Sequence, residues 1–438
     1  MGVDKKRVFV KINPDLNNHK EETMGAPFYR ETVLPNGLRI ATKRFPGTTT
    51  FSLAIVIKKG SIHDPPRLAG LAHFLEHMVH KGTKRWPSSD QLNAQFESRG
   101  IEQNALTSNN YTSFFVTEVM LKFLEHSFDF LTEITTRPLL REEDVATEQG
   151  VIIDEHFTRK DRSEAEVSEL LNRMLYLHSP LGRRIEGQQA TIKRIQGSDL
   201  TRMHQKYYVH NNMMVVAIGN VYHRQIVKLA RHYLGHMKRH RIALISIKPS
   251  RLSGQNRRRI CQPTLNASYL NIGSKFDGLS QKEIAILDIL SNVLGGGTLS
   301  RLFRLIRTRL GKVYSIDASV TDFKIHQDLT INTAPLPEDL EEIIRIIITE
   351  IQRLKDGILA KELKLAKTQI IADYYRMTKY SEDFMDEFIA SLVHQTTQSS
   401  FTNNIPVIRS ITLNDVRQFL AQHWKPENFR IAIIAPKK

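Results

Sequence analysis

The sequence repeats itself at a constant offset. Residues 194–219 align within residues 409–435 when 216 positions are added, so that Asp199 meets Asp415. Each copy has the pattern of a polar helix cap, an amphipathic helix and a buried apolar strand. A chain of 438 residues is also too long for one hydrophobic core. The repeat therefore predicts two homologous domains of similar size.

Charge marks the boundary between the two copies. The chain has 62 Lys and Arg residues against 46 Asp and Glu, a formal net charge of +16. Residues 236–262 hold eight basic residues and no acidic one, whereas residues 1–235 hold 32 and 26, and residues 263–438 hold 22 and 20. We interpret 236–262 as a solvated basic linker between domains 1–235 and 263–438. Without an aromatic-rich RNA-binding motif, the charge alone does not predict a nucleic-acid partner.

The pattern of the first copy predicts an α+β fold. Residues 32–45 contain two short β-runs around a Pro-Asn-Gly turn, and residues 51–60 and 104–120 read as further strands. Interleaved helices and antiparallel strands predict that each domain is a mainly antiparallel sheet with helices packed on one face. The expected helices cover 68–80, 121–136 and about 142–175.

Several classes of protein are excluded by composition. The sequence has no run of 18 apolar residues, which argues against a transmembrane helix and a membrane partner. The basic start lacks an apolar segment typical of a secretory signal, and residues 1–28 hold too many acids for a transit peptide. The single cysteine, Cys261, cannot form an internal disulfide or a cysteine-based metal cage. We therefore expect a cytoplasmic protein.

The most informative motif is His73-Phe74-Leu75-Glu76-His77. On a helix, His73 and His77 lie one turn apart on the same face, where two imidazoles can bind one Zn²⁺. Glu76 lies beside them and can take a proton from a water that zinc has activated. This HxxEH order is the reverse of the commoner HExxH and is typical of the inverted zincins. The alternative is a helix whose histidines are buried in the core, hydrogen-bonded to neighbouring groups, and bind no metal.

A catalytic zinc site needs a third protein ligand. Glu148 and Glu155 are seven residues apart in a helical pattern and share a face, so one can bind the metal while the other orients a ligand. Asp154 points about 100° away on an ideal helix and is a weaker candidate. His80 rises about 10.5 Å along the helix from His73, too far to join the same ion. We expect packing or supporting roles for His80 and for His156.

These segments resemble the pitrilysin/insulinase family of zinc metallopeptidases. GLAHFLEHMVHKGT resembles its metal helix, EQGVIIDE its third-ligand segment, and GGGTLSRLFRLIRTRLGKVYS a motif of its second domain. The half-size members, such as the β-subunit of mitochondrial processing peptidase and its bacterial relatives, are the most similar. The resemblance implies one Zn²⁺ per chain, with Glu155 as third ligand and Glu148 as supporting acid. His80 and His156 stand where the family usually has apolar residues.

The resemblance implies endoproteolysis of unfolded or short peptides, with Glu76 as general base. It implies that Asn104 and Ala105 lie on the edge strand that binds the substrate backbone. It also implies that Arg307 and Tyr314 of the second domain reach the substrate near the scissile bond. If that segment is helical, their spacing of seven keeps them on one side.

The second copy has lost the metal motif. At an offset of about 215, the three motif residues fall on Asp288, Ser291 and Asn292, which cannot reproduce the site. Full-length family members close a chamber with four such domains, so the resemblance implies a dimer of this two-domain chain. Both motifs occur on one chain, which favours a homodimer, although a heterodimer with a related chain stays open. The alternatives are a non-catalytic scaffold of the same fold and a presequence-type processing peptidase.

Overall fold

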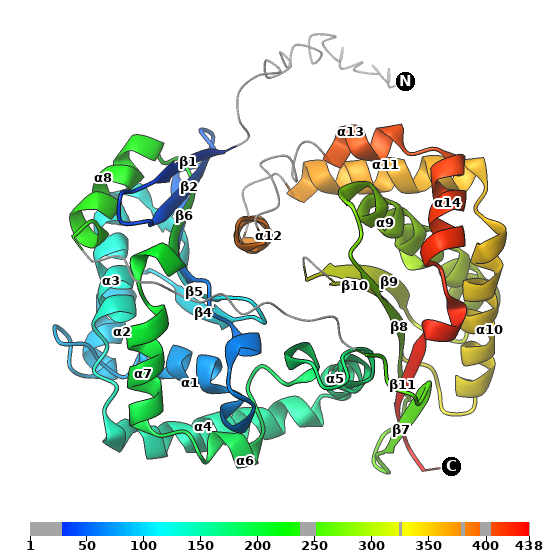
Figure 1. Cartoon of the computed structure of the whole chain (residues 1–438), viewed down its shortest axis with the longest axis horizontal. Helices are drawn as coiled ribbons and strands as arrows, with labels where there is room; N and C mark the ends of the chain where they lie inside the picture. Colours follow the sequence, from blue (N-terminus) through cyan, green and yellow to red (C-terminus); the bar gives the residue numbers. More distant parts are fainter. Residues whose placement is uncertain (1–28, 237–250, 324–325, 378–381, 395–403, 438) are drawn as a thin grey trace, which may run out of the picture.

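The computed structural model describes residues 29–236, 251–323, 326–377, 382–394 and 404–437. Two sheets stand on opposite sides of the molecule, each flanked by helices (Figure 1). The expected α+β fold with two similar units is confirmed. The predictions for residues 1–28 and for most of the linker, 237–250, concern residues outside the described ranges.

The first sheet has six strands in the described part of the chain, ordered β1-β2-β6-β3-β5-β4. One neighbouring pair, β2 with β6, runs parallel, and the other pairs run antiparallel. The short hairpin predicted around Pro35-Asn36-Gly37 is the β1–β2 connection. Gly37 has a φ of 91°, which a side chain would strain. The strands are β1 (Arg30–Val33), β2 (Arg39–Arg44), β3 (Thr50–Ile57), β4 (Gln103–Thr107), β5 (Thr112–Met120) and β6 (Met213–Gly219).

Within the described residues, the second sheet repeats this order without a counterpart of β1. Its described strands are ordered β7-β11-β8-β10-β9, with β7 parallel to β11 and the other pairs antiparallel. The matching topology explains the offset of 216, because β6 and β11 occupy the same place in their sheets. The strands are β7 (Arg257–Cys261), β8 (Tyr269–Asp277), β9 (Ile316–Asp322), β10 (His326–Thr333) and β11 (Arg430–Ala435).

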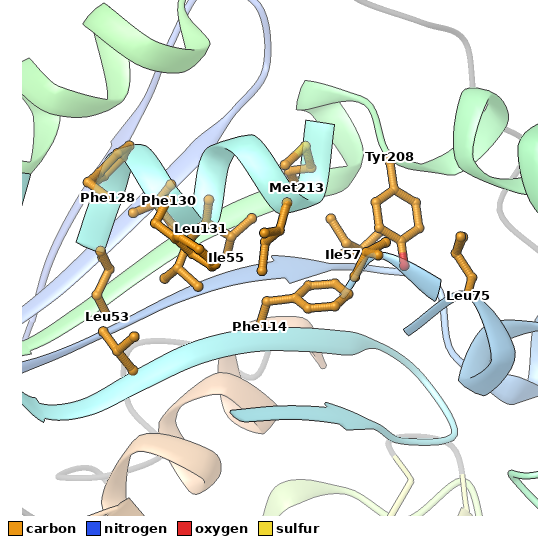
Figure 2. Close-up of a cluster of buried hydrophobic side chains, with 14 of the residues drawn as sticks. Leu53, Ile55, Ile57, Leu75, Phe114, Phe128, Phe130, Leu131, Tyr208 and Met213 are labelled. Atoms are coloured by element: carbon orange, nitrogen blue, oxygen red, sulfur yellow. The ribbon is translucent and has the colours of Figure 1, made fainter. Parts of the chain in front are cut away.

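Apolar side chains of alternate residues bury one face of the first sheet under helices. Leu53, Ile55 and Ile57 of β3 project from the same side of the strand, toward Phe128 and Leu131 of a covering helix (Figure 2). The covering helices include α1 (Leu71–Met78), α2 (Ser89–Glu97), α3 (Leu124–Thr136), α7 (Gly197–Tyr207) and α8 (His223–Leu234). On the second sheet the corresponding layer includes α9 (Gln281–Gly295), α10 (Leu340–Arg353), α11 (Ala360–Met377), α13 (Asn404–Ser410) and α14 (Leu413–His423).

The single helix expected over about 142–175 is wrong. It is divided into α4 (Glu142–Asp161) and α5 (Ser163–Leu175) at Arg162, whose backbone is extended with φ −83° and ψ 101°. The two helices bury their apolar faces in different places. Val145 and Ile152 of α4 join the core of the first sheet, whereas α5 packs elsewhere. A continuous helix could not satisfy both cores.

The two halves exchange one helix each. Leu170, Leu171 and Met174 of α5 pack with Ala432 and Ile434 of the second sheet, on the face opposite to its other helices. In return, α12 (Glu382–Val393) places Phe384, Phe388 and Leu392 against Ala54 and Val56 of the first sheet. Figure 1 shows α12 lying between the two sheets.

This exchange corrects the simple division of the chain. One helix of span 1–235 completes the second unit, and one helix of span 263–438 completes the first. The end of the predicted linker is also structured, because β7 pairs with β11 as part of the second sheet. Among the described residues, every helix is too short or too polar to cross a bilayer.

Candidate active site

A buried ion pair fixes the start of the helix that carries the HxxEH motif. Lys59 Nζ lies 2.6 Å from Asp64 Oδ1, and both side chains are almost fully buried. The other oxygen of Asp64 accepts hydrogen bonds of 3.2 Å from the backbone N–H groups of Gly70 and Ala72. Asp64 therefore satisfies two of the unpaired N–H groups at the start of α1. This places His73 at a defined depth and rotation.

Three side chains from two helices converge at one point. Glu155 Oε2 of α4 lies 3.6 Å from His73 Nε2 and 3.5 Å from His77 Nε2 of α1. Ligand atoms held about 2.1 Å from a tetrahedral zinc ion lie roughly 3.4 Å apart. Two imidazoles and one carboxylate in this spacing fit a Zn²⁺ ion and leave a fourth position open. This is the one set of three or more His, Cys, Asp or Glu residues with such spacing in the described ranges.

The supporting acid orients one of these imidazoles. Glu148 Oε1 lies 2.8 Å from His77 Nδ1, so the imidazole can donate from Nδ1 and point Nε2 at the metal position. The second oxygen of Glu148 pairs with Lys81, which lies in the turn after α1. Burial works to lower the pKa of His77, but its hydrogen bonds to Glu148 and Glu155 outweigh burial and raise it to about 9. Metal binding at neutral pH therefore displaces a proton.

Glu76 is held at the centre of the site. Its side chain is 9% exposed, and its Oε2 accepts a hydrogen bond from the hydroxyl of Thr107 at the end of β4. Burial raises the pKa of Glu76, although the bond from Thr107 works in the opposite direction. A carboxylate with a raised pKa is better matched to proton transfer near neutral pH.

The strand residues Asn104 and Ala105 lie beside this carboxylate. Both line a pocket of about 330 Å³ together with Glu76, His77 and His80. β4 is at one end of the first sheet, so its outer edge has no neighbouring strand in the described ranges. His80 reaches the pocket, while its ring lies 6.0 Å from that of Phe114.

His73 and His156 differ in their relation to the metal position. Burial, together with the positive field of His77, lowers the pKa of His73 to about 4, so its imidazole is neutral and ready to bind a metal. His156 lies outside the converging set, with Nδ1 3.7 Å from Glu186 Oε1 behind the site. Asp154 is exposed on α4.

Arg307 and Tyr314 belong to the second half of the chain, and the metal residues belong to the first. In the described part of the chain, no hydrogen bond or ion pair joins either of them to His73, His77 or Glu155. The condition that one helix carries both residues is not met, because the helical segment Phe303–Arg309 ends before Tyr314 and Gly311 turns the chain with a φ of 66°. Arg307 Nε still donates to the backbone oxygen of Tyr314 at 3.1 Å, and the Tyr314 side chain is 88% exposed.

Four residues that support the site were not predicted from the sequence, namely Lys81, Thr107, Lys59 and Asp64. Lys81 lies beyond the last residue of α1, so its contact with Glu148 depends on the turn that follows the helix and not on helical spacing. Thr107 follows Ala105 by two positions and shares its face of the strand, which is a weak signal. No sequence pattern predicted the Lys59–Asp64 ion pair, because it depends on how the chain after β3 packs against the loop before α1.

The fold and the side-chain cluster define a two-domain α+β protein with a candidate metal site, and the family comparisons identify its family. The model for insulinase, peptidase family M16, matches residues 39–189. The model described as the peptidase M16 inactive domain matches residues 194–370, which include the degenerate copy of the motif. These two spans together cover well over half of the chain. The chain belongs to peptidase family M16, in which it is a half-size member.

Relatives in bacteria share nearly the whole length. An uncharacterized zinc protease of Mycobacterium tuberculosis is 26% identical over 410 residues, which are 93% of each chain. An uncharacterized zinc protease of Bacillus subtilis is 26% identical over 92% of this chain and 97% of its own. Among solved structures, a protease from Helicobacter pylori has the same fold, with a TM-score of 0.85 and 20% identity over 94% of this chain and 100% of its own.

Proposed function

We propose that this chain is a zinc-dependent endopeptidase that cleaves unfolded or short peptides. The observation that carries the proposal is the convergence of His73 Nε2, His77 Nε2 and Glu155 Oε2 beside the buried carboxylate of Glu76. Relatives named zinc proteases support the same metal. Zinc would be held by His73, His77 and Glu155, and when bound it supplies Lewis acidity to water and to the scissile carbonyl.

The residues around the metal position have separate tasks. Glu76 accepts the proton of the attacking water and later delivers it to the leaving amine. Thr107 holds the Glu76 carboxylate in one orientation by donating to it. Glu148 keeps His77 in the tautomer that directs Nε2 to the metal, and Lys81 balances the charge of Glu148.

Substrate binding falls to the free edge of β4. An extended peptide that adds to this edge is held mainly by its backbone, with Asn104 and Ala105 alongside. Such binding requires an unfolded segment, because a folded substrate has already paired its backbone groups. The proposal therefore predicts cleavage of unstructured peptides and little cleavage of stable folded proteins.

We also propose that the working form is a homodimer. The periplasmic protease PqqL from Escherichia coli has the same fold, and this chain covers 48% of it. Its structure thus has room for two units of this size, which supports a four-domain assembly for this chain. The exposed Tyr314 and its neighbour Arg307 would then complete the site of the partner copy, where they can donate to the carbonyl oxygen as it becomes negative.

Mixing two inactive variants tests the dimer. Glu76→Gln removes the base from one site, and Arg307→Ala removes the donor supplied to the other. If each second domain serves its partner, co-refolded mixtures regain activity, because some dimers hold one intact site. A protein that stays monomeric in light-scattering measurements, or a mixture without recovery, would contradict the shared site.

The fold alone does not establish catalysis. A chain of Complex III2 from Candida albicans has a TM-score of 0.79 to this chain at 16% identity. The scaffold alternative predicts a protein without stoichiometric zinc and without peptidase activity. The sequence-based expectation of a cytoplasmic protein stays a prediction, and cell fractionation would test it.

Chelation tests the proposed function. Purified protein should cleave an unstructured quenched peptide, lose this activity with a zinc chelator, and recover it when about one equivalent of Zn²⁺ is returned. A stable folded protein that contains the same sequence as the peptide should resist cleavage. Activity that survives removal of all metal, or metal-loaded protein that cleaves no peptide, would refute the proposal.

A further inference from the structure

The pocket beside Glu76 is lined almost wholly by polar side chains. Besides the site residues, it is formed by His80 in the turn after α1, Ser89 and Asn93 of α2, and Gln103 of β4. Its volume of about 330 Å³ accommodates a large side chain, so size alone does not select its occupant. Its position next to the general base and the edge strand places it where a substrate residue beside the scissile bond would project.

The hydrogen-bonding groups of this pocket are largely uncommitted. In the described ranges, the side chains of Ser89 and Asn93 and the ring of His80 have no hydrogen-bond partner, and Gln103 Oε1 is buried without one. Contact with Phe114 fixes one side of the His80 ring. The two ring nitrogens of His80 are groups that can donate or accept a hydrogen bond at the wall of the pocket.

The charged groups of the pocket are already paired. Glu148 is bound by His77 and Lys81, and Glu76 by Thr107. The ammonium group of Lys81 opposes a cationic side chain, and the two carboxylates oppose an anionic one. An apolar side chain would leave Gln103 Oε1, which is buried without a partner, unpaired, and this is costly. A neutral side chain with both a donor and an acceptor satisfies all these conditions.

We infer that this pocket is a specificity site for a neutral hydrogen-bonding side chain, best a carboxamide, at the residue flanking the scissile bond. The inference rests on the proposed peptidase function. A glutamine side chain presents one carbonyl acceptor and two N–H donors, which match the amides of Asn93 and Gln103 and the imidazole of His80. Methionine has a similar length without these groups, so the two residues make a matched pair of substrates.

The test compares kcat/KM for quenched peptides that carry Gln, Met, Glu or Lys at either residue flanking the scissile bond. The wild-type enzyme should prefer Gln over Met by about tenfold at one of these positions, because a site built to hydrogen-bond discriminates against a substrate that lacks the groups. Glu and Lys peptides should be poorer than Gln.

Two variants assign the preference to this pocket. His80→Phe removes both ring nitrogens and keeps an aromatic ring beside Phe114, and Asn93→Leu changes an exposed position of α2 that folding does not require. Each should reduce the Gln-to-Met ratio to about one. The control Gln91→Leu, on an exposed position of the same helix outside the pocket, should keep the wild-type ratio.

The outcomes separate the two claims. Zinc-loaded wild type that cleaves no peptide overturns the proposed function and this inference with it. Peptide cleavage without a preference for Gln, or a preference unchanged by both pocket variants, overturns only the specificity site.

Discussion

The two halves of this chain build the same helix-and-sheet frame around different chemistry. In the first half, α1 and α4 bring His73, His77 and Glu155 to one point. In the second half, α9 and α11 frame a pocket of about 220 Å³ lined by Asp288, Ser291 and Asn292, the residues at the matching positions. The backbone was duplicated, but the ligand set was not.

Two polar side chains of the second pocket donate hydrogen bonds to backbone carbonyl groups of the second half. Ser291 Oγ donates to the carbonyl oxygen of Ala318 at 2.9 Å, and Asn292 Nδ2 donates to that of Gly296 at 3.4 Å. At an offset of 216, Glu148 and Glu155 correspond to Lys364 and Ile371, so the supporting acid and the third ligand are both absent. The two halves share the backbone fold that positions such side chains. They differ in the side chains of the candidate site, which are His73, Glu76, His77, Glu148 and Glu155.

The largest expected effect comes from removing one ligand. His77→Ala should abolish stoichiometric zinc binding and reduce peptide cleavage to background, since a catalytic zinc site needs three protein ligands. The matched change in the other half, Asn292→Ala, should leave both zinc content and kcat/KM unchanged. Metal analysis and a quenched-peptide assay measure the two quantities. A loss of activity in Asn292→Ala with the fold intact would break the proposed division of labour.

A smaller effect is expected from the residue that orients His77. Glu148→Gln removes the carboxylate that accepts from His77 Nδ1 and pairs with Lys81. Loss of such a partner costs about 10–100-fold in metal affinity or activity. Competition with a fluorescent chelator measures the zinc affinity. Glu143→Gln, on an exposed position of the same helix, is the control, and equal zinc affinities for the two variants would contradict the role of Glu148.

The second pocket should reveal itself through the pH dependence of stability. Burial, with the negative fields of Asp322 and Glu387, raises the pKa of Asp288 to about 7 from an ordinary 3.8. The folded state therefore holds this proton more tightly than the unfolded state, and the resulting stability is lost as the pH rises from about 4 through 7.

Asp288→Asn removes this penalty. Its gain in the free energy of unfolding over wild type should grow between pH 5 and pH 8 by roughly 2–3 kcal/mol, since about two units of the pKa difference fall in this range and one unit corresponds to about 1.4 kcal/mol. Denaturant titrations at the two pH values measure the gain. A gain that is the same at both would show that Asp288 titrates normally.

The smallest effect is expected at the basic edge of the second sheet. Arg257 of β7 pairs with Glu341, and both side chains are more than a third exposed. Such pairs contribute roughly 0–1 kcal/mol, so Arg257→Ala should lower the stability slightly and leave kcat/KM unchanged. Peptide cleavage that depends on the basic residues of 251–262 would point to a role for this charge in substrate binding.

The parts of the fold that the sequence predicted depend on local patterns. The repeat, the hairpin at Gly37 and the shared face of His73 and His77 follow from spacing along the chain. The exchange of α5 and α12 was not predictable in this way, because an amphipathic helix shows which of its faces is buried but not which sheet buries it. The break at Arg162 was hidden for the same reason, since the helical pattern continues across it.

In the candidate site too, spacing along the chain predicted some features, and tertiary packing determines the others. The spacing of Glu148 and Glu155 placed both on one face, but distances were needed to show that Glu155 lies near both imidazole Nε2 atoms and Glu148 near Nδ1 of His77. Thr107 and Asp64 contribute through contacts between strands, loops and α1, which depend on tertiary packing. Hence local spacing predicts the ligands better than it predicts their supports.

The most direct test of the account is a comparison of wild type with Glu76→Gln in zinc content and peptide cleavage. Glu76 is not a ligand in the proposed site, so both proteins should hold about one zinc per chain. Cleavage should fall by about 10²–10⁴-fold in the variant, because only the proton acceptor is lost. Unchanged cleavage by the zinc-loaded variant, or wild type that binds no zinc, would contradict the central claim.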